Sequence, residues 1–244
     1  MASPTSFTGI DSSSTTSSRF NNNIISEQIT MKRPTLMKAA MAALLVLATG
    51  GLSFSNPNSS QAGTAPAPLR YGQTYKLVNG YQNSQGGYLD TRGRGCEENL
   101  LCVSTAVGSD RDSGSGSWKI VSKTGKTGVV KSFDDVYLQN QYQGNGGYLD
   151  TRGQGCEKNL LCVSTANSTN RDSGSGTWKI IPDFGPNGRI TENQPVHLLN
   201  GYGNWQGGYL DTRGRGCESN LLCVSTAVGS DRDSGSGTWK FVKQ

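Results

Sequence analysis

Six cysteines stand in three pairs along the chain, and cysteine chemistry offers two uses for them, a disulfide bond or a metal site. Zinc sites favour C-x2-C-like spacing together with histidines, whereas this chain has a single histidine, His197, outside the paired pattern. Six cysteines allow many pairings, but the threefold repetition favours a local bond in each copy. We therefore predict no metal site and one disulfide within each of the pairs Cys96/Cys102, Cys156/Cys162 and Cys217/Cys223.

A second pattern, DRDS at 110–113, places oxygen-bearing side chains at alternate positions and invites comparison with a calcium loop. An EF-hand loop needs a bidentate glutamate at its twelfth position, and counted from Asp110 that position is Val121. Arg111 would also repel a cation, and Asp110 is replaced by Asn170 in the second copy. We interpret the segment as a tight turn that precedes a tryptophan-bearing strand.

The elements that position these residues repeat three times. The stretch GGYLDTRGRGCEENLLCVSTAVGSDRDSGSGSWK at 86–119 recurs at 207–240 with two changes, and a third version occupies 146–179. Each copy holds four short runs of β-branched or aromatic residues bounded by Gly, Asn, Asp or Ser, which is typical of strands. No window shows helical apolar spacing. The sequence therefore predicts an all-β chain of twelve strands.

Three such copies must share one core, because a single unit of this size cannot bury its apolar residues alone. Closure of the three units also limits exposed strand edges. We predict a β-trefoil of three four-stranded repeats, each of about 60 residues. A β-prism and an open array of modules joined by the linkers 122–135 and 182–195 are the alternatives. The expected core residues are Leu89, Leu149, Leu210, Leu101, Leu161, Leu222, Trp118, Trp178 and Trp239.

Composition narrows the class of protein. The chain has 33 glycines and only 33% hydrophobic residues, as expected for short strands joined by many turns. The chain has a net charge of +5, and its basic residues are interspersed with acidic ones along the sequence. Nucleic-acid binders instead carry a basic stripe with stacking aromatics, so this pattern argues against a nucleic-acid partner. One histidine, with no nucleophile elbow, phosphate loop or repeated acid pair, argues against an enzyme and against a cofactor.

The chain ahead of the repeats has the order of a secretory signal peptide. Lys32, Arg33 and Lys38 precede an apolar stretch at 39–54, and Ser60-Gln61-Ala62 offers small residues for cleavage. The apolar stretch is shorter than the roughly 20 residues of a membrane span, so an uncleaved anchor is the weaker alternative. We predict a secreted or periplasmic protein with no stable membrane span after cleavage.

These features divide the chain into segments. Residues 1–30 are a leader or an upstream extension ahead of a true start at Met31. The predicted segments after it are the signal peptide at 31–62, a flexible linker at 63–70 and a β-trefoil domain at 71–244, with repeats at about 71–130, 131–190 and 191–244.

The motif order GGYLDT, NLLCVS and DSGSGTWKI resembles the ricin-B-type β-trefoil lectin repeat, and the Y-L-D start with a W-x-I ending also resembles the MIR-type trefoil repeat. The likeness covers 75–242. It implies a carbohydrate-binding module with up to three shallow sites, in which the aspartate of the L-D step accepts hydrogen bonds from sugar hydroxyls. A fixed carboxylate can take two such donors at once. By position, the implied aspartates are Asp90, Asp150 and Asp211.

The chain departs from the ricin pattern in two places. Gly116, Gly176 and Gly237 replace the glutamine of the Q-x-W motif, and the third strand lacks the aromatic residue that stacks on sugar. We therefore expect stacking to come from the first turn of each unit. The candidates there are Tyr81, Tyr142, Tyr202 and Trp205, beside Asn79, Asn140 and Asn200.

Each candidate has a structural alternative. The aspartates can pair with the nearby Arg92, Arg152 and Arg213 or bond to turn N–H groups, and each Asn-x-Tyr can be a turn with a packing tyrosine. The leading hypothesis is a secreted lectin, multivalent for a glycan or polysaccharide. The alternatives are a trefoil-type protease inhibitor acting through a unique linker such as 123–131, and a structural protein of an extracellular matrix or envelope.

Overall fold

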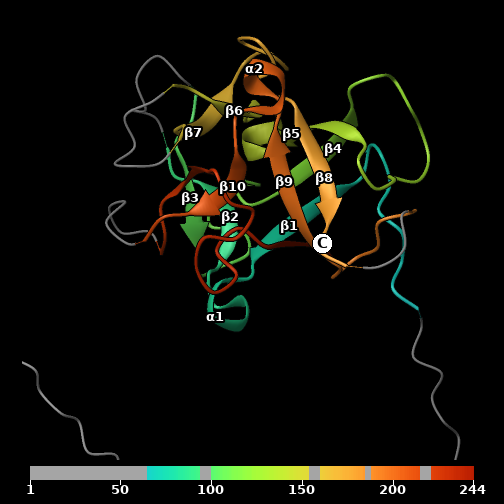
Figure 1. Ribbon diagram of the computed structural model, residues 1–244, viewed down its shortest axis with the longest axis horizontal. Coiled ribbons are helices and arrows are strands. Elements are labelled where there is room, and N and C mark those ends of the chain that lie inside the picture. Colours follow the sequence, from blue (N-terminus) through green and yellow to red (C-terminus); the bar gives the residue numbers. More distant parts are fainter. Residues whose placement is uncertain (1–64, 94–99, 154–159, 185–187, 215–220) are drawn as a thin grey trace, which may run out of the picture. The chain divides into compact units, whose positions relative to one another are not determined.

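The computed structural model describes residues 65–244 except 94–99, 154–159, 185–187 and 215–220 (Figure 1). The predicted leader and signal peptide, and one cysteine of each pair, lie outside the described residues. No helix in the described ranges is long and apolar enough to cross a membrane.

Within the described residues the chain forms twelve strands, and every strand pair is antiparallel. The all-β prediction is therefore confirmed. The four strands of each copy follow the predicted runs closely. They are β1 (Thr74–Asn79), β2 (Tyr88–Thr91), β3 (Val103–Ala106) and β4 (Trp118–Ser122), then β5 (Asp135–Asn140), β6 (Tyr148–Thr151), β7 (Val163–Ala166) and β8 (Trp178–Pro182), then β9 (Pro195–Asn200), β10 (Tyr209–Thr212), β11 (Val224–Ala227) and β12 (Trp239–Lys243).

The first and fourth strands of the copies form a closed ring in the order β1, β4, β5, β8, β9, β12 and back to β1. The second and third strands form three hairpins, β2–β3, β6–β7 and β10–β11, and β3, β7 and β11 contact one another. Every second junction of the ring joins two different copies. The copies therefore share one barrel, and the open array of modules is wrong.

Backbone hydrogen bonds in a threefold cycle cross one end of the barrel. The N–H of Leu69 donates to the carbonyl of Ile190 at 2.8 Å, that of Val130 to Leu69 at 2.9 Å, and that of Ile190 to Val130 at 3.1 Å. All three side chains are fully buried. The prediction of a flexible linker at 63–70 is thus wrong at its end, because Leu69 belongs to the core.

A second cycle joins the hairpins. The N–H groups of Leu101, Leu161 and Leu222 each donate to a threonine hydroxyl of another copy, at 3.1, 3.0 and 3.0 Å. The acceptors are Thr165, Thr226 and Thr105 in that order.

The prediction of the core is confirmed for the leucines of the second strands and for the three tryptophans, whereas Leu101, Leu161 and Leu222 are buried but lie outside the core cluster. Trp118, Trp178 and Trp239 are fully buried. Each indole Nε1 donates to the carbonyl of the leucine on the second strand of the same copy, at 2.8–2.9 Å. An indole needs such a partner when it is buried. Three one-turn segments, α1 (Tyr81–Ser84), η1 (Tyr142–Gly144) and α2 (Tyr202–Trp205), follow the first strand of each copy.

Candidate functional site

Two corresponding clefts lie between neighbouring copies. They have volumes of about 200 and 270 Å³. In each cleft one copy contributes seven residues and the next copy contributes a tyrosine. The first is lined by Thr91, Arg92, Gly93, Leu101, Arg111, Asp112, Ser115 and Tyr142, and the second by Thr212, Arg213, Gly214, Leu222, Arg232, Asp233, Ser236 and Tyr81.

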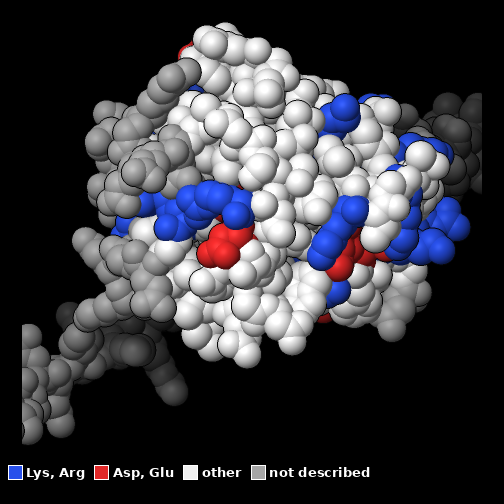
Figure 2. All heavy atoms as spheres, turned by 90° about the horizontal axis from the view of Figure 1, so that it is seen from above, with Lys and Arg blue, Asp and Glu red and all other residues white. Residues whose placement is uncertain are grey.

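The sequence supplies a third set of the same residue types. It consists of Thr151, Arg152, Gly153, Leu161, Arg171, Asp172, Ser175 and Tyr202. Figure 2 shows one face of the molecule, on which basic and acidic side chains lie beside one another among uncharged residues.

Asp90, the first of the three predicted sugar acceptors, lies beneath the first cleft with a fully buried side chain. Its Oδ2 accepts from the hydroxyl of Ser115 at 3.0 Å. Its Oδ1 lies 3.3 Å from Nη2 of Arg111, an ion pair that lacks hydrogen-bond geometry. Burial raises the pKa of Asp90, against the lowering effects of the Ser115 hydrogen bond and the Arg111 charge.

The other two aspartates repeat this arrangement. Asp150 accepts from Ser175 at 2.9 Å and lies 3.2 Å from Arg171. Asp211 accepts from Ser236 at 3.0 Å and lies 3.0 Å from Arg232. The three carboxylates therefore face their own protein, which corrects the prediction that they accept sugar hydroxyls directly. Each carboxylate forms an ion pair with the arginine of the following DRD or NRD turn, whereas the sequence had pointed to Arg92 and its copies.

The three predicted asparagines are also buried, and they link neighbouring copies. The Nδ2 groups of Asn79, Asn140 and Asn200 donate to the carbonyls of Ser236, Ser115 and Ser175 at 2.8, 2.7 and 2.7 Å. Their Oδ1 atoms accept from the backbone N–H of Tyr81, Tyr142 and Tyr202 at 3.2, 3.0 and 3.1 Å. The structural interpretation is correct for them, because they position the tyrosines.

Two glycine positions are explained by this framework. A Cβ on Gly86 would lie 2.1 Å from Oδ1 of Asn79, so the backbone passes the buried amide closely. A Cβ on Gly116, which stands where the ricin motif has glutamine, would lie 2.2 Å from the carbonyl of Ser109. The departure from the ricin motif therefore has a steric cause.

The tyrosines are the predicted residues that reach the clefts. Tyr81 and Tyr142 line the two clefts, and Tyr202 is 37% exposed. The ring of Trp205 instead forms a cation–π contact, in which Nζ of Lys179 lies 3.9 Å from the ring centroid. Lys179 is held in turn by Asp135 at 2.6 Å, so one face of the indole is covered by a lysine.

One cysteine of each predicted pair lies within the described residues. Cys102, Cys162 and Cys223 are disulfide-bonded and buried. Their pairing with Cys96, Cys156 and Cys217 stays a prediction, because those three lie outside the described residues.

The DRDS segment forms the predicted turn. Oδ1 of Asp110 accepts from the N–H of Gly114 at 3.0 Å, and Ser113 has a φ of 48°. In the described ranges no cluster of acidic, histidine or cysteine side chains is placed to hold a metal ion. The single histidine, His197, bonds through Nδ1 to the carbonyl of Gly237 at 2.9 Å.

Sequence reasoning missed the cleft arginines and the aspartates of the turn as site residues. Arg111, Asp112 and their counterparts line the clefts, yet in the sequence they stand in what reads as a tight turn. The available signal was their repetition, since the arginine and the second aspartate of this turn are identical in all three copies while the linkers differ.

No protein-family model and no curated protein matches this chain. Solved structures do, although their names differ widely. A Caenorhabditis elegans protein of unknown function matches with a TM-score of 0.57 and 16% identity, over 74% of this chain and 99% of that one. The SDF2-like protein from Arabidopsis thaliana matches with 0.54 and 18%, over 72% and 94%. The water-soluble chlorophyll protein from Brassica oleracea matches with 0.51 and 12%, over 72% and 94%. At these identities the likeness shows the fold alone.

Proposed function

We propose that this chain is a β-trefoil carbohydrate-binding protein that holds saccharides in the clefts between neighbouring repeats. One observation carries the proposal: eight equivalent residues line each of two corresponding clefts, and each set is completed by a tyrosine from the next copy. Sugar rings offer hydroxyl donors, hydroxyl acceptors and an apolar face. Arginine donors, an aspartate acceptor and a tyrosine ring match these three features.

The charge of the clefts favours an uncharged, hydroxyl-rich ligand. In the second cleft Arg213 and Arg232 are balanced by Asp233 on the wall and by Asp211 beneath it. A site for phosphate or sulfate needs an excess of cations, because its ligand brings negative charge. The balance supports a neutral saccharide over a nucleic acid.

The size of the clefts supports weak, multivalent binding. Their volumes of about 200 and 270 Å³ lie below the ~300–1,000 Å³ of typical small-molecule sites. Sites of this kind gain avidity when a polymer engages several of them at once. The proposal therefore includes a repetitive glycan or polysaccharide as the ligand.

We also propose that the protein acts outside the cytoplasm. Cys102, Cys162 and Cys223 are disulfide-bonded, and disulfides persist in oxidising compartments. The signal-peptide pattern at 31–62 supports the same location. Protection of the cysteines from thiol labelling in the exported protein tests this point, and full labelling without a reductant would refute it.

The full chain on a broad glycan array tests the proposed binding. A variant with Tyr81→Ala, Tyr142→Ala and Tyr202→Ala is compared with Phe184→Ala, which removes an exposed aromatic outside the clefts. We expect the triple variant to lose at least about tenfold in retention on the glycan found, since truncation of an aromatic anchor at a binding surface commonly costs more than about 1 kcal/mol. Phe184→Ala should bind as the parent does.

Two results would refute the proposal. The first is the absence of binding across the array. The second is glycan binding that the triple variant retains in full. Inhibition of a trypsin-like protease, abolished by changes in the linker 123–131, would favour the inhibitor alternative instead.

A further inference from the structure

Trp205 differs from the other three tryptophans of the chain. Trp118, Trp178 and Trp239 are fully buried, and each donates from its indole N–H to a carbonyl of the barrel. Trp205 lies in α2, is partly exposed and stands outside the core cluster. Its indole N–H has no hydrogen-bond partner among the described residues. Packing of the core therefore does not account for this ring or its unused donor.

The fold does not require a tryptophan at this position. In the first copy the equivalent residue is Ser84, whose backbone has a φ of 70°, against 69° for Trp205. In the second copy the turn is one residue shorter. A bulky residue is rare in this left-handed region, and such outliers cluster at functional sites. Trp205 is thus an addition to a scaffold whose other copies fold without it.

A lysine and an aspartate fix the indole. Nζ of Lys179 lies 3.9 Å from the centroid of the ring and 2.6 Å from Oδ1 of Asp135. In the first copy a serine occupies the same place, since Nζ of Lys240 donates to Oγ of Ser84 at 3.2 Å. A serine is therefore enough to meet this lysine. An indole held on one face by a cation is instead a rigid platform, which loses little freedom when a ligand binds.

The platform stands beside the third set of cleft residues, called here the third site. Tyr202 completes that set and begins the one-turn segment that Trp205 ends. The N–H of Gly203 donates to the carbonyl of Ser173 at 3.1 Å, which holds this segment against the turn that carries the arginine and aspartate of the site. Lys179 follows that turn on β8. One segment therefore presents a tyrosine and an indole, three residues apart, to the same neighbouring copy.

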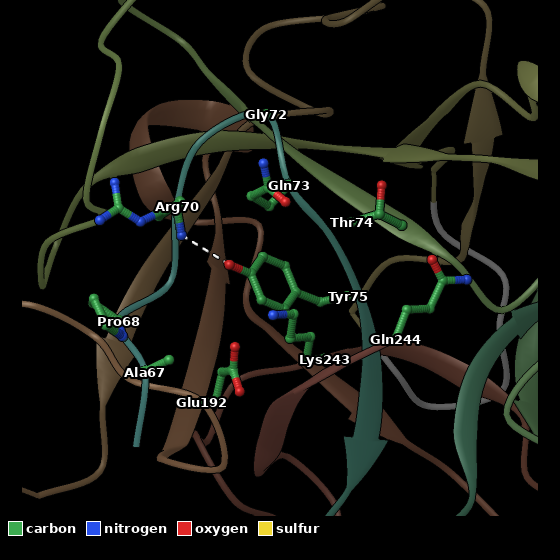
Figure 3. A pocket seen from close by; sticks show the side chains of 10 residues that line it. All are labelled: Ala67, Pro68, Arg70, Gly72, Gln73, Thr74, Tyr75, Glu192, Lys243 and Gln244. Atoms are coloured by element: carbon green, nitrogen blue, oxygen red, sulfur yellow. Dashed lines mark hydrogen bonds between the residues drawn. The ribbon is translucent and has the colours of Figure 1, made fainter. Parts of the chain in front are cut away.

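The largest of the pockets described, at the start of β1, offers no such platform. Its volume is about 480 Å³, and Figure 3 shows its lining. Tyr75, the aromatic residue of the lining, is only 3% exposed, and its Oη accepts from the N–H of Arg70 at 2.9 Å (Figure 3). The ring of Tyr75 is therefore closed to stacking, and this pocket supplies control positions.

We propose that Trp205 is a second stacking position beside the third site, so that this site binds an oligosaccharide of at least two sugar residues. The inference rests on the proposed saccharide binding and gives one site a preference that the two clefts lack. One sugar residue lies against Tyr202, and the next lies on the part of the indole that Lys179 leaves uncovered. The indole N–H donates to a hydroxyl of that second residue.

Tryptophan fluorescence of the full chain tests the inference, because Trp205 is the partly exposed one of the four tryptophans. The probes are cellohexaose, chitohexaose, laminarihexaose and the strongest array glycan, each compared with its monosaccharide. We expect a saturable change in emission whose half-saturation lies at least about tenfold below that of the monosaccharide. Tyr202→Ala should raise the half-saturation at least about tenfold, and Gln73→Ala, in the pocket of Figure 3, should not change it.

Exchange of residues between the first and third copies separates binding from folding. Trp205→Ser installs the residue of the first copy, so it should unfold at the urea midpoint of the parent but lose the sugar-dependent change in emission. Ser84→Trp should create a second responding indole, beside the cleft that Tyr81 lines, and so enlarge the change.

The outcomes also distinguish this inference from the proposed function. Absence of binding on the array refutes both. Array binding with no change in tryptophan emission for any probe overturns the second stacking position alone. Equal half-saturation by an oligosaccharide and its monosaccharide overturns it as well, and so does an emission change that survives in Trp205→Ser.

Discussion

Asn140 of the second copy donates from Nδ2 to the carbonyl oxygen of Ser115 in the first copy, at 2.7 Å. Through its Oδ1 the same side chain accepts from the N–H of Tyr142, and the hydroxyl of Ser115 donates to Asp90. One buried chain of contacts therefore runs from the carboxylate beneath the first cleft to the tyrosine on its wall. The fold and the cleft depend on the same bonds.

Replacement of Asn140 by alanine should cost both stability and binding at one cleft. The change removes one hydrogen bond from the carbonyl of Ser115, which still accepts from the N–H of Thr91 at 3.2 Å, and it leaves the N–H of Tyr142 without its acceptor. A lost hydrogen bond costs about 0.5–1.5 kcal/mol, and an unsatisfied buried group costs about 1–3 kcal/mol. We expect the free energy of unfolding to fall by about 2–4 kcal/mol in urea titrations. Asn145→Ala, an exposed amide of the same turn, should change it by less than about 0.5 kcal/mol. Equal effects of the two variants would contradict the role given to Asn140.

Most of the fold was predictable because its information is local and repeated. Short runs bounded by turn residues gave strand positions, and three copies required one shared core. The alternation that buries Trp118 and Ile120 but leaves Lys119 between them partly exposed follows from strand periodicity alone. The burial of Leu69 was not predicted, because a single apolar residue in a proline-rich segment shows no strand periodicity. Only its backbone hydrogen bonds with Val130 and Ile190 make it part of the core.

The candidate site was less predictable, for a physical reason. Sequence order placed Asp90 next to Arg92, whereas the hairpin and the turn that follows bring Arg111 to the carboxylate from 21 residues away. Burial of Asp90 and Asn79 also depends on packing between copies, which no single repeat encodes. The tyrosines were named because the third strand lacks the aromatic of the ricin pattern, and their contact with a sugar stays a prediction.

Gly86 is predicted to tolerate no side chain. A Cβ there would lie 2.1 Å from Oδ1 of Asn79, whose amide is itself fixed by the hydrogen bond to Ser236. Overpacking of this kind costs about 1–3 kcal/mol or more, so Gly86→Ala should lower the urea midpoint clearly. Gly108→Ala is the control, because no atom lies within 4 Å of the added carbon. A wild-type midpoint for Gly86→Ala would show that Asn79 can move aside.

Removal of the Arg111 charge should destabilise the protein more at neutral than at acidic pH. Burial raises the folded-state pKa of Asp90 while Ser115 and Arg111 oppose it, so the folded protein bears a penalty for the ionised form that vanishes when the group is protonated. Arg111→Met enlarges this penalty. We expect a loss of about 1–2 kcal/mol at pH 7, discounted for the 38% exposure of Arg111, and a smaller loss near pH 3.5. Arg189→Met, an exposed arginine, should show neither loss, and a pH-independent loss for Arg111→Met would contradict the argument.

Replacement of Asp134 should also cost more at neutral than at acidic pH, but here the folded-state pKa of the carboxyl is lowered, whereas that of Asp90 is raised. Burial would raise its pKa, but hydrogen bonds from Lys126, Tyr71 and the N–H of Lys131, at 2.6, 2.6 and 2.8 Å, outweigh this and lower it. A lowered folded-state pKa gives stability that is present above the ordinary carboxyl range and is lost as the pH falls through the folded value. Asp134→Asn should therefore cost about 1–3 kcal/mol at pH 7 and markedly less at pH 2.5, where the parent carboxyl is itself increasingly protonated. Urea unfolding at the two pH values measures the difference, and Asp172→Asn, at an exposed carboxylate that accepts from the neighbouring Ser173 hydroxyl, serves as the control. A cost for Asp134→Asn that grows on acidification would show that burial, and not the three donors, sets the pKa of this group.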